Sequence, residues 1–230
     1  MNSIFSHLQN KIYILIGEIH GIKENVEILK LFTELYFTKY NSKLILAFEW
    51  PVQLEKEINA YIQNHGDLNW RKWEFIKYKD GRISKEHIFF LKWVKKINFR
   101  LQKSQQIKIR CFDVIAKNWN ERDKKMANIL LHNIKDKRVK VVAIMGNFHA
   151  SKKPFVFDGV KYIPLGSYLP KNKTISVKLE YMSGYFCNGT IKKILPITKN
   201  INFVSKFVLR KTGKSGYDYI LLVKKANPTR

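Results

Sequence analysis

Near the start of the chain lies the stretch Ile12-Tyr-Ile-Leu-Ile-Gly17-Glu18-Ile-His20-Gly21, an apolar run that ends in a glycine, a carboxylate and a histidine. Five apolar residues in a row, without polar alternation, predict a strand buried on both faces, as in a parallel sheet. Side chains alternate along an extended chain, so Glu18 and His20 are expected to point the same way. A carboxylate beside an imidazole can share a proton-transfer task or a metal ion. The stretch therefore predicts a buried strand with reactive groups at its carboxyl end.

Three later apolar runs repeat this design and also end near a polar residue; they cover residues 43–49, 107–113 and 139–145. Helical patterns of apolar residues separate the runs, at residues 22–40, at residues 54–64 and from about residue 118 onward. Strands and helices that alternate in this way require right-handed crossovers and a largely parallel sheet, whose strand ends lie at one edge. We therefore expect the following residues to converge there: Glu18, His20, Glu49, Asp113 and His149.

The length and the composition predict a single well-cored domain over residues 1–230. Of the 230 residues, 45% are hydrophobic and 13% are aromatic, as in globular rather than disordered proteins. Beyond residue 151 the helical periodicity fades, and strand-like runs at residues 161–166, 174–179 and 217–223 alternate with turn residues. The predicted fold class is therefore α/β, with a mainly parallel central sheet flanked by helices and a β-rich C-terminal part.

The segment from Asp67 to Lys103 is the least regular part of the chain and is rich in aromatic and basic residues. We predict that it is a helical insertion that forms a lid over the strand ends. Trp70, Trp73 and Trp93 are interleaved with basic residues, a pattern that also suits stacking on bases and contacts with phosphates. The whole chain carries 43 Lys and Arg against 18 Asp and Glu, a net charge of +25. This excess indicates either a polyanionic partner such as nucleic acid or a compositional bias toward lysine.

The cysteines and the chain start bear on the cellular compartment. Cys111 and Cys187 lie far apart and outside any CxxC arrangement, so neither a zinc knuckle nor a disulfide framework is predicted. The first ten residues lack a basic segment followed by a long apolar stretch, and no later run is long enough to span a bilayer. A cytoplasmic location is the resulting expectation.

Four motifs, in order along the chain, resemble those of the erythromycin esterase/ChaN-like superfamily. They are Gly17-Glu18-Ile-His20, Glu49 after the second apolar run, Arg122-Asp123-Lys-Lys-Met126-Ala127 in a predicted helix, and Gly146-Asn-Phe-His149. This superfamily also takes in the TraB/TIKI proteins and a domain of a Pasteurella toxin. The order and spacing match from residue 12 to about residue 150, and ChaN-like proteins look closer than macrolide esterases.

The resemblance implies an α/β sheet with a pocket at the strand ends. The residues that it assigns to this pocket are Glu18, His20, Glu49, Arg122 and His149. The superfamily includes esterases, proposed metal-dependent peptidases and haem-binding lipoproteins, so the resemblance leaves the chemistry open. This chain has no signal-peptide pattern, in contrast to the ChaN lipoproteins, and this difference argues against a role in haem uptake.

Other polar residues have different expected roles. Arg122 lies one helical turn before Met126, on the face expected to look inward, where it needs a pocket carboxylate or a substrate oxyanion as partner. Asp123 is expected to serve the helix N-terminus, and Asp113 is expected to form a turn. Three histidines have surface-like neighbours and receive no role: His65, His87 and His132.

The preferred hypothesis is a hydrolase in which water attacks an ester bond or, as a second choice, a peptide bond. His20 would act as the general base, oriented by Glu18 or Glu49. Arg122 and His149 would stabilise the developing oxyanion. Neither serine nor cysteine stands in a context such as GxSxG, and this favours water over a covalent intermediate.

Two alternatives remain open from the sequence. In the first, a divalent zinc, manganese or iron ion activates the water, although Arg122 in the same pocket would repel a cation. Its ligands would be Glu18, His20, Glu49 and His149. In the second, the protein is a non-catalytic binding module for haem, or for nucleic acid or another polyanion through residues 67–103.

Overall fold

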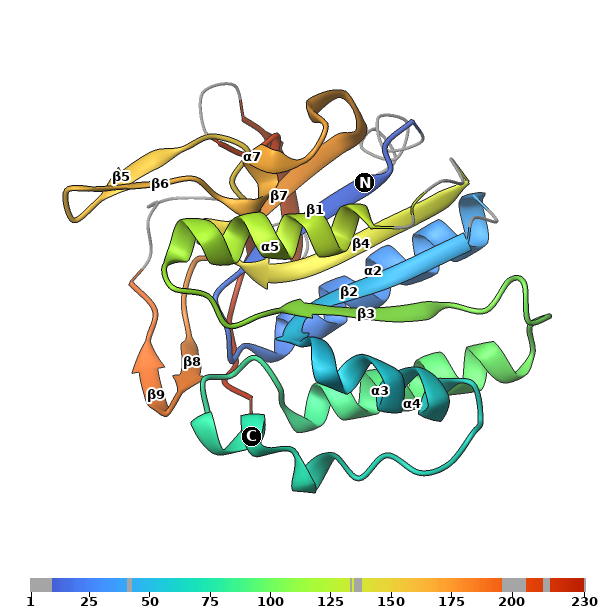
Figure 1. Ribbon diagram of the computed structural model, residues 1–230. Coiled ribbons are helices and arrows are strands. Elements are labelled where there is room, and N and C mark those ends of the chain that lie inside the picture. The colour runs from blue at the N-terminus through green and yellow to red at the C-terminus, as the bar shows by residue number, and fades with distance from the viewer. Residues whose placement is uncertain are drawn as a thin grey trace.

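A seven-stranded sheet forms the centre of the computed structural model (Figure 1), which describes residues 10–40, 43–132, 134, 138–195, 206–212 and 216–229. The strand order is β10-β11-β7-β1-β4-β2-β3. The strands are β1 (Tyr13–Glu18), β2 (Lys43–Pro51), β3 (Lys108–Asp113), β4 (Val139–Gly146), β7 (Thr174–Tyr181), β10 (Phe207–Lys211) and β11 (Tyr219–Val223). Every neighbouring pair is parallel except β10 and β11. The predicted α/β class with a mainly parallel sheet is confirmed.

Strand β1 lies in the middle of this sheet, between β4 and β7, and all six of its residues are buried. Its register places Glu18 beside Gly146 at the end of β4. Phe48 of β2 pairs with Ile144 of β4 and with Cys111 of β3. Because the four strands run parallel and in near register, their carboxyl ends share one edge of the sheet. That edge carries the polar residues that follow each apolar run.

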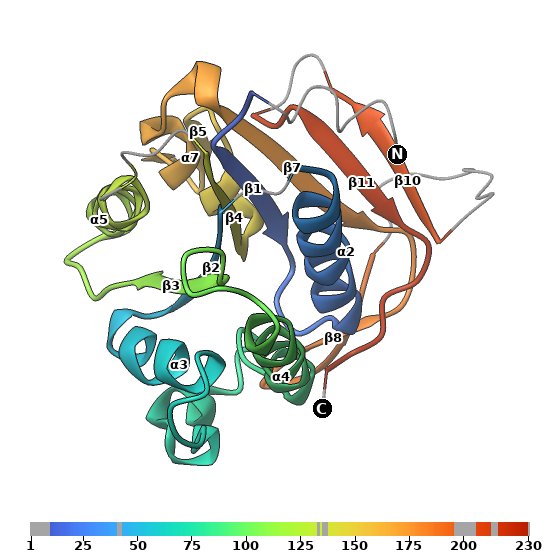
Figure 2. The same ribbon diagram turned by 90° about the vertical axis from the view of Figure 1, so that its right-hand side faces the viewer.

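Helices cover both faces of the sheet (Figure 2). One apolar cluster joins α2 (Lys23–Tyr40), α3 (Glu55–Ile62) and α4 (Lys85–Phe99) to one face. A second cluster joins α5 (Trp119–Leu131), α6 (Asn147–Ala150) and α7 (Leu165–Tyr168) to the other face. Ile14 and Ile16 of β1 belong to the first cluster, whereas Tyr13 and Leu15 belong to the second. The period of two along a strand therefore supplies both halves of the core from one apolar run.

The region after β4 adds two hairpins outside the main sheet. Strands β5 (Phe155–Phe157) and β6 (Val160–Tyr162) form one, and strands β8 (Tyr185–Asn188) and β9 (Thr190–Lys193) form the other. The β5–β6 turn is the pair Asp158-Gly159, whose φ angles are 51° and 73°. Positive φ at both positions is the geometry of the tight hairpin turn that favours Asp-Gly. This turn fixes which side chains of the two strands share a face.

Two predicted strand ends differ from the structure. β2 does not end at Glu49 but continues through Trp50 to Pro51, with a register shift between Phe48 and Pro51. Proline can lie in a strand at such an irregularity because no regular ladder bond is required of its nitrogen. The strand predicted at residues 161–166 is also too long, since β6 ends at Tyr162 and the helical turn α7 begins at Leu165.

The segment of residues 67–103 divides into two parts. Its first half is a loop with the short 3₁₀ turns η2 (Trp70–Lys72) and η3 (Glu74–Tyr78), and it runs past the strand ends. Its second half is α4, in which Ile88, Leu91 and Val94 are buried against the sheet layer. A lid over the strand ends therefore stays a prediction for the first half, while the second half belongs to the core. None of the helices in the described ranges combines the length and the apolarity needed to cross a bilayer.

Candidate active site

The polar ends of four parallel strands meet in one cleft. Glu18 ends β1, Glu49 lies near the end of β2, Asp113 ends β3, and His149 follows β4 within the short helix α6. Arg122 reaches the same place from the first turn of α5. The cleft has a volume of about 790 Å³ and is lined by His20, Glu49, Asp113, Arg122 and His149 among others. Glu18 lies behind His20, in a small cavity that also contacts Glu49.

Glu49 is the central carboxylate of this arrangement. Its Oε1 accepts a hydrogen bond from Arg122 Nη2 at 2.8 Å, and its Oε2 accepts one from the backbone N–H of Gly146 at 2.8 Å. Burial acts to raise the pKa of Glu49, but His149, His20, Arg122 and the Gly146 N–H outweigh it and hold the pKa well below its ordinary value. Glu49 therefore stays ionised and holds Arg122 and the backbone of Gly146 in place. It is a weak proton acceptor.

Arg122 is held in place by three partners. Its Nε donates to Asp113 Oδ1 at 2.8 Å, and its Nη2 also lies 2.7 Å from that oxygen. Nη2 further donates to Glu49, and Nη1 lies 3.0 Å from Nε2 of His149. A guanidinium carries five N–H donors, so one N–H on Nη1 has no partner among the described residues. Arg122 thus combines a rigid position with one donor left for a ligand.

His149 uses both of its ring nitrogens. Nδ1 lies 2.8 Å from Asp123 Oδ1, and Nε2 faces the Nη1 of Arg122. An arginine has no acceptor, so Nε2 must accept from Arg122, and the ring proton must sit on Nδ1, where it is donated to Asp123. Asp123 also accepts the backbone N–H of Leu165 at 2.6 Å, and Trp119 stacks on the imidazole at a centroid distance of 5.8 Å. The whole arrangement orients His149 to hold Arg122.

His20 differs because one of its ring nitrogens has no hydrogen-bond partner in the described chain. Nδ1 lies 2.8 Å from Oε1 of Glu18, whereas Nε2 faces the cleft, 3.6 Å from Oε2 of Glu49. The second distance is too long for a hydrogen bond. Burial disfavours the imidazolium, but the Glu18 hydrogen bond and the charges of Glu49 and Glu18 prevail and raise the pKa of His20. Burial is the main reason why the pKa of Glu18 is raised in turn.

Glycines allow this close approach of backbone and side chains. The chain leaves β1 through Gly21, which has a φ of 80° and whose added Cβ would lie 1.9 Å from the carbonyl oxygen of Cys187. Only glycine fits there without strain. A Cβ on Gly146 would lie 3.3 Å from Nε2 of His20. The Gly-Glu-x-His-Gly pattern therefore reflects packing as well as chemistry.

A second arginine extends the ion network toward the 67–103 segment. Arg82 donates from Nη1 to Asp113 Oδ2 at 2.6 Å, and its Nη2 lies 2.6 Å from Asp80 Oδ2. Its carbonyl accepts the indole N–H of Trp50 at 2.8 Å. Asp113 therefore bridges Arg82 and Arg122, and the loop before α4 lines one wall of the cleft through Trp73, Asp80 and Arg82.

The structure brings together the five residues expected at the pocket and corrects three other expectations. Asp113 was expected to form a turn, but it anchors both arginines. Asp123 was expected to serve the helix N-terminus, but it holds His149. His87 was expected at the surface, but it is buried and lies near His20. Its Nδ1 is hydrogen-bonded to the hydroxyl of Ser84 at 3.1 Å. The position of Asp113 at a strand end was the one sequence signal that pointed to its role.

The surroundings do not fit a metal ion held by Glu18, His20, Glu49 and His149. Within the described ranges, no group of three or more His, Cys, Asp and Glu side chains is arranged to hold one. Glu49 already accepts from Arg122 and Gly146, and His149 has its nitrogens directed at Asp123 and Arg122. The guanidinium occupies the place between the carboxylate and the imidazole that a cation would need.

The aromatic residues of the 67–103 segment mostly pack inward. Trp73 is 6% exposed and donates its indole N–H to Glu57 Oε2 at 3.0 Å. Trp70 and Trp93 are partly buried and pack against the apolar cluster of α2, α3 and α4. Base stacking requires an exposed ring face. The geometry of Trp70, Trp73 and Trp93 gives no support to a nucleic-acid interface at this segment.

Comparison with known proteins assigns the fold. No protein-family model and no curated protein sequence matches the chain. A mutant of the erythromycin esterase EreC, in its open conformation, superposes with a TM-score of 0.72 and 9% identity, over 100% of this chain and 94% of its own. ChaN of Campylobacter jejuni, described with cofacial haem binding, superposes with a TM-score of 0.50 and 16% identity, over 97% of this chain and 92% of its own. This chain has the erythromycin esterase/ChaN-like fold.

The same fold extends to a solved succinoglycan biosynthesis protein. It superposes with a TM-score of 0.79 and 11% identity, over 99% of this chain and 91% of its own. The resemblance inferred from the four motifs is thus confirmed at the level of the erythromycin esterase/ChaN-like fold. Identities between 9% and 16% show the architecture alone, so the activity has to be argued from the cleft.

Proposed function

We propose that this protein is a hydrolase in which His20 activates a water molecule for attack on an ester carbonyl. The observation that carries the proposal is the His20–Glu18 pair, in which Nδ1 is bound at 2.8 Å while Nε2 faces the cleft that Arg122 also lines. A hydrogen bond at one ring nitrogen sets the tautomer and leaves the lone pair of the other available. This is the arrangement required of a general base.

The charges around the cleft favour His20 over Glu49 as the base. The best general base has a pKa near the working pH. The pKa of Glu49 is held far below that range by its charged neighbours, whereas the pKa of His20 is raised from an ordinary value already close to neutrality. At neutral pH, Glu49 is therefore a poor proton acceptor. His20 can take a proton from water and later return it to the departing alcohol.

Arg122 is the proposed oxyanion-binding group. When water adds to the carbonyl carbon, the oxygen gains negative charge, and a preorganised donor stabilises it. The remaining N–H of Arg122 belongs to Nη1, the nitrogen that also contacts His149, and the other donors keep the guanidinium from moving. The tetrahedral intermediate then collapses, the carbon–oxygen bond to the alcohol breaks, and the acid product is released.

The cleft walls support attack by water rather than by a side chain. None of the described residues that line the cleft is serine, threonine, cysteine or lysine. Those residue types form the usual covalent acyl intermediates. The free thiols of Cys111 and Cys187 are not among the lining residues either. A peptide bond is a second candidate substrate for the same mechanism, with a poorer leaving group.

The test is a panel of esters that differ in acyl and alcohol groups. We expect at least one to be hydrolysed, and we expect His20→Ala to lower kcat by about 10²–10⁴-fold, the usual contribution of a general base. His65→Ala is the matched control, because His65 is exposed and lies outside the cleft. Wild-type turnover in His20→Ala would show that the mechanism is wrong.

Haem binding is a second candidate because Nε2 of His20 could serve as an iron ligand and because the fold is shared with ChaN. The walls beside His20 carry the carboxylates of Glu49, Asp80 and Asp113, a poor match for a large apolar ring. This candidate therefore ranks behind hydrolysis. Titration with haem decides between them: we expect no absorption change that depends on His20. A haem spectrum present in the wild type and lost in His20→Ala would favour the binding role.

A further inference from the structure

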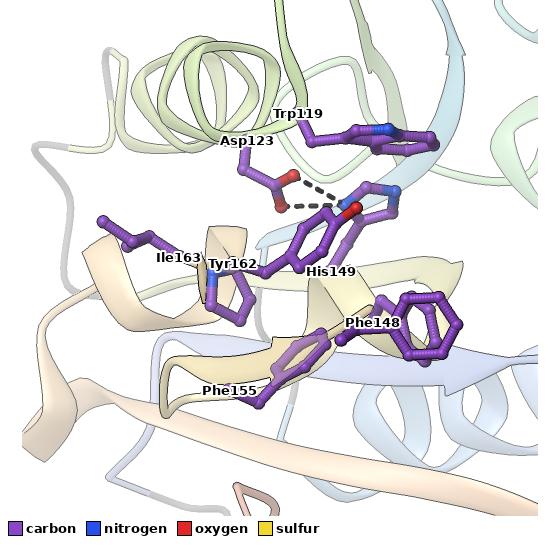
Figure 3. Close-up of a pocket in the computed structure, with 9 residues that line it drawn as sticks. Trp119, Asp123, Phe148, His149, Phe155, Tyr162 and Ile163 are labelled. Carbon is purple, nitrogen blue, oxygen red and sulfur yellow. Dashed lines mark hydrogen bonds and ion pairs between the residues drawn. The ribbon is translucent and has the colours of Figure 1, made fainter. Parts of the chain in front are cut away.

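A separate apolar pocket adjoins the charged cleft (Figure 3). It has a volume of about 170 Å³ and lies between the start of α5, the helix α6 and the β5–β6 hairpin. Its walls are aromatic and consist of Trp119, Phe148, Phe155, Phe157 and Tyr162. The sequence predicted neither the pocket nor the hairpin that completes it.

The hairpin concentrates aromatic rings on one of its faces. Phe148 lies 5.3 Å from Phe155 and 5.4 Å from Phe157, measured between ring centroids, and Phe155 stacks on Tyr162 at 5.7 Å. Val156 stands between the two phenylalanines on β5 and is absent from the pocket lining. The period of two along the strand thus directs the rings inward and Val156 away from the pocket.

Several of these rings are left exposed in the folded protein. Trp119 is 55% exposed, Phe148 is 52% exposed and Phe157 is 50% exposed. A cluster of large aromatic side chains that the fold leaves uncovered is unusual on a monomer surface and typically marks a binding site. A concave apolar site with few polar groups is the form that small-molecule sites take.

The polar groups at the base of the pocket are already paired with each other. Nδ1 of His149 lies 2.8 Å from Oδ1 and 2.9 Å from Oδ2 of Asp123, as the dashed lines in Figure 3 mark. Asp123 also accepts from the backbone of Leu165. The pocket therefore presents no unpaired charge and would penalise a charged ligand group, which would lose water without gaining a partner. An uncharged apolar group fits.

The volume sets the size of that group. An engineered apolar cavity of about 150 Å³ in another protein binds benzene. The present pocket, at about 170 Å³, is close to that size. A single six-membered ring is therefore the kind of group that matches this volume. Aromatic walls also favour an aromatic guest, which gains offset-stacked or edge-to-face contacts with them.

Trp119 and His149 line both this pocket and the charged cleft. His149 in turn contacts Nη1 of Arg122, so a group bound in the pocket is separated from Arg122 by His149 alone. We propose that the pocket binds a single uncharged aromatic ring of the substrate, so that the ester attached to it lies within reach of Arg122 and His20. This proposal rests on the proposed hydrolase function for the ester, but the ring site is tested by itself.

Binding is measured first, without turnover, by a ligand-observed NMR titration of the His20→Ala protein with benzyl alcohol. Cyclohexanol and ethanol serve as comparison ligands. We expect benzyl alcohol to bind best, cyclohexanol more weakly, and ethanol at least about tenfold more weakly than benzyl alcohol. Equal binding of ethanol and benzyl alcohol, or no binding of either, would overturn the proposal.

Two variants locate the bound ring. Phe155→Ala removes a wall of the pocket and is expected to weaken benzyl alcohol binding by about tenfold or more. Val156→Ala is the matched control on the same strand and is expected to leave binding unchanged. Tyr162→Ala removes the ring that stacks on Phe155 and is expected to weaken binding to a similar degree while circular dichroism remains that of the parent. Unchanged binding in Phe155→Ala and in Tyr162→Ala would place the ligand elsewhere and overturn the proposal.

Turnover separates this proposal from the proposed function. For an ester that carries one phenyl ring, Phe155→Ala should raise KM about tenfold with little change in kcat, because the ring contributes binding rather than chemistry. Benzyl alcohol binding with no hydrolysis of any ester would remove the hydrolase function and leave the ring site intact. Hydrolysis that shows no preference for single-ring esters, together with no benzyl alcohol binding, would remove the ring site alone.

Discussion

His20 and His149 lie at the same edge of the sheet but have different hydrogen-bond partners. Both imidazoles follow a buried parallel strand, and both bind a carboxylate through Nδ1 at 2.8 Å. Nε2 of His149 is bound by Arg122 at 3.0 Å, and its side chain is 8% exposed. Nε2 of His20 has no partner within hydrogen-bond distance in the described chain, and its side chain is 22% exposed.

The difference shows that a histidine–carboxylate pair is not by itself a catalytic unit. What decides the role is the second ring nitrogen. His149 cannot take up a proton at Nε2 without breaking its bond to Arg122, so it serves as a positioning group. His20 can take up a proton without losing any protein hydrogen bond. The four predictions that follow test this division of roles, from the largest expected effect to the smallest.

Replacing each histidine by alanine should separate activity from stability. His20→Ala should lose most of the turnover while Tm falls by only about 2–4 °C, because Glu18 is the one protein group that loses a hydrogen bond to His20. His149→Ala should lower Tm by roughly 5–10 °C, since Arg122 and Asp123 each lose a charge-assisted hydrogen bond. Differential scanning calorimetry and ester turnover measure the two effects. A large Tm loss in His20→Ala with none in His149→Ala would reverse the assignment.

Arg122→Met should reduce both turnover and stability. Loss of an oxyanion donor commonly costs about 10²–10³-fold in kcat. Unpairing the buried Glu49 and the partly buried Asp113 should also lower the free energy of unfolding by about 3 kcal/mol. Arg122→Lys is the control: it keeps one charge but loses the fork that contacts both carboxylates. We expect urea unfolding to show partial recovery of stability in Arg122→Lys. Full turnover in that variant would argue against the bidentate role.

Asp123→Asn tests whether the tautomer of His149 matters. The N–H of the new amide would then face the N–H at Nδ1 of His149, and two donors repel each other. The imidazole should therefore turn and weaken its contact with Arg122. We expect a loss of roughly 1–2 kcal/mol in unfolding free energy and a modest fall in kcat of about tenfold. Lys124→Ala, at the next position on α5, is the control because its side chain is exposed. If Asp123→Asn equals wild type in both measurements, His149 does not depend on its carboxylate.

Glu18→Gln should change the pH dependence more than the maximum rate. The base form of His20 is neutral, so kcat/KM should rise as pH increases through the pKa of His20. Carboxylates raise that pKa, so the acidic limb of the kcat/KM profile should lie above the ordinary histidine pKa of about 6.5. Removing the Glu18 charge should lower the pKa and move the limb to lower pH. The pH profile of kcat/KM measures this shift. A limb that stays in place or moves upward would contradict the role of Glu18.

Part of this site was predictable because it follows strand ends. Glu18, Glu49 and His149 come directly after apolar runs, and buried parallel strands bring such positions to one edge. Arg122 was predictable from its place one turn before the buried Met126. Asp123 was misassigned because its two options, the helix terminus and a partner 26 positions away, cannot be told apart from local sequence.

Arg82 and the aromatic pocket had no comparable signal. Arg82 stands in an irregular loop, and only the folded chain brings it within 2.6 Å of Asp113. The rings of the pocket come from α5, α6 and the β5–β6 hairpin, which are separate in sequence. Phe155 and Phe157 alternate as a strand should, but nothing in that alternation says which helix the aromatic face will meet.

By itself, the sequence determined the α/β class, the burial of β1 on both faces and the edge of the sheet at which the charged residues gather. These follow from local patterns, because the period of the apolar residues and the crossover rule act on each segment in turn. Only the tertiary structure decided which nitrogen of each histidine stays available, because Arg122 satisfies one imidazole and leaves the other exposed to the cleft. Hydrogen-bond pairing over long sequence separations depends on distances of a few tenths of an ångström, and those are set by packing of the whole domain.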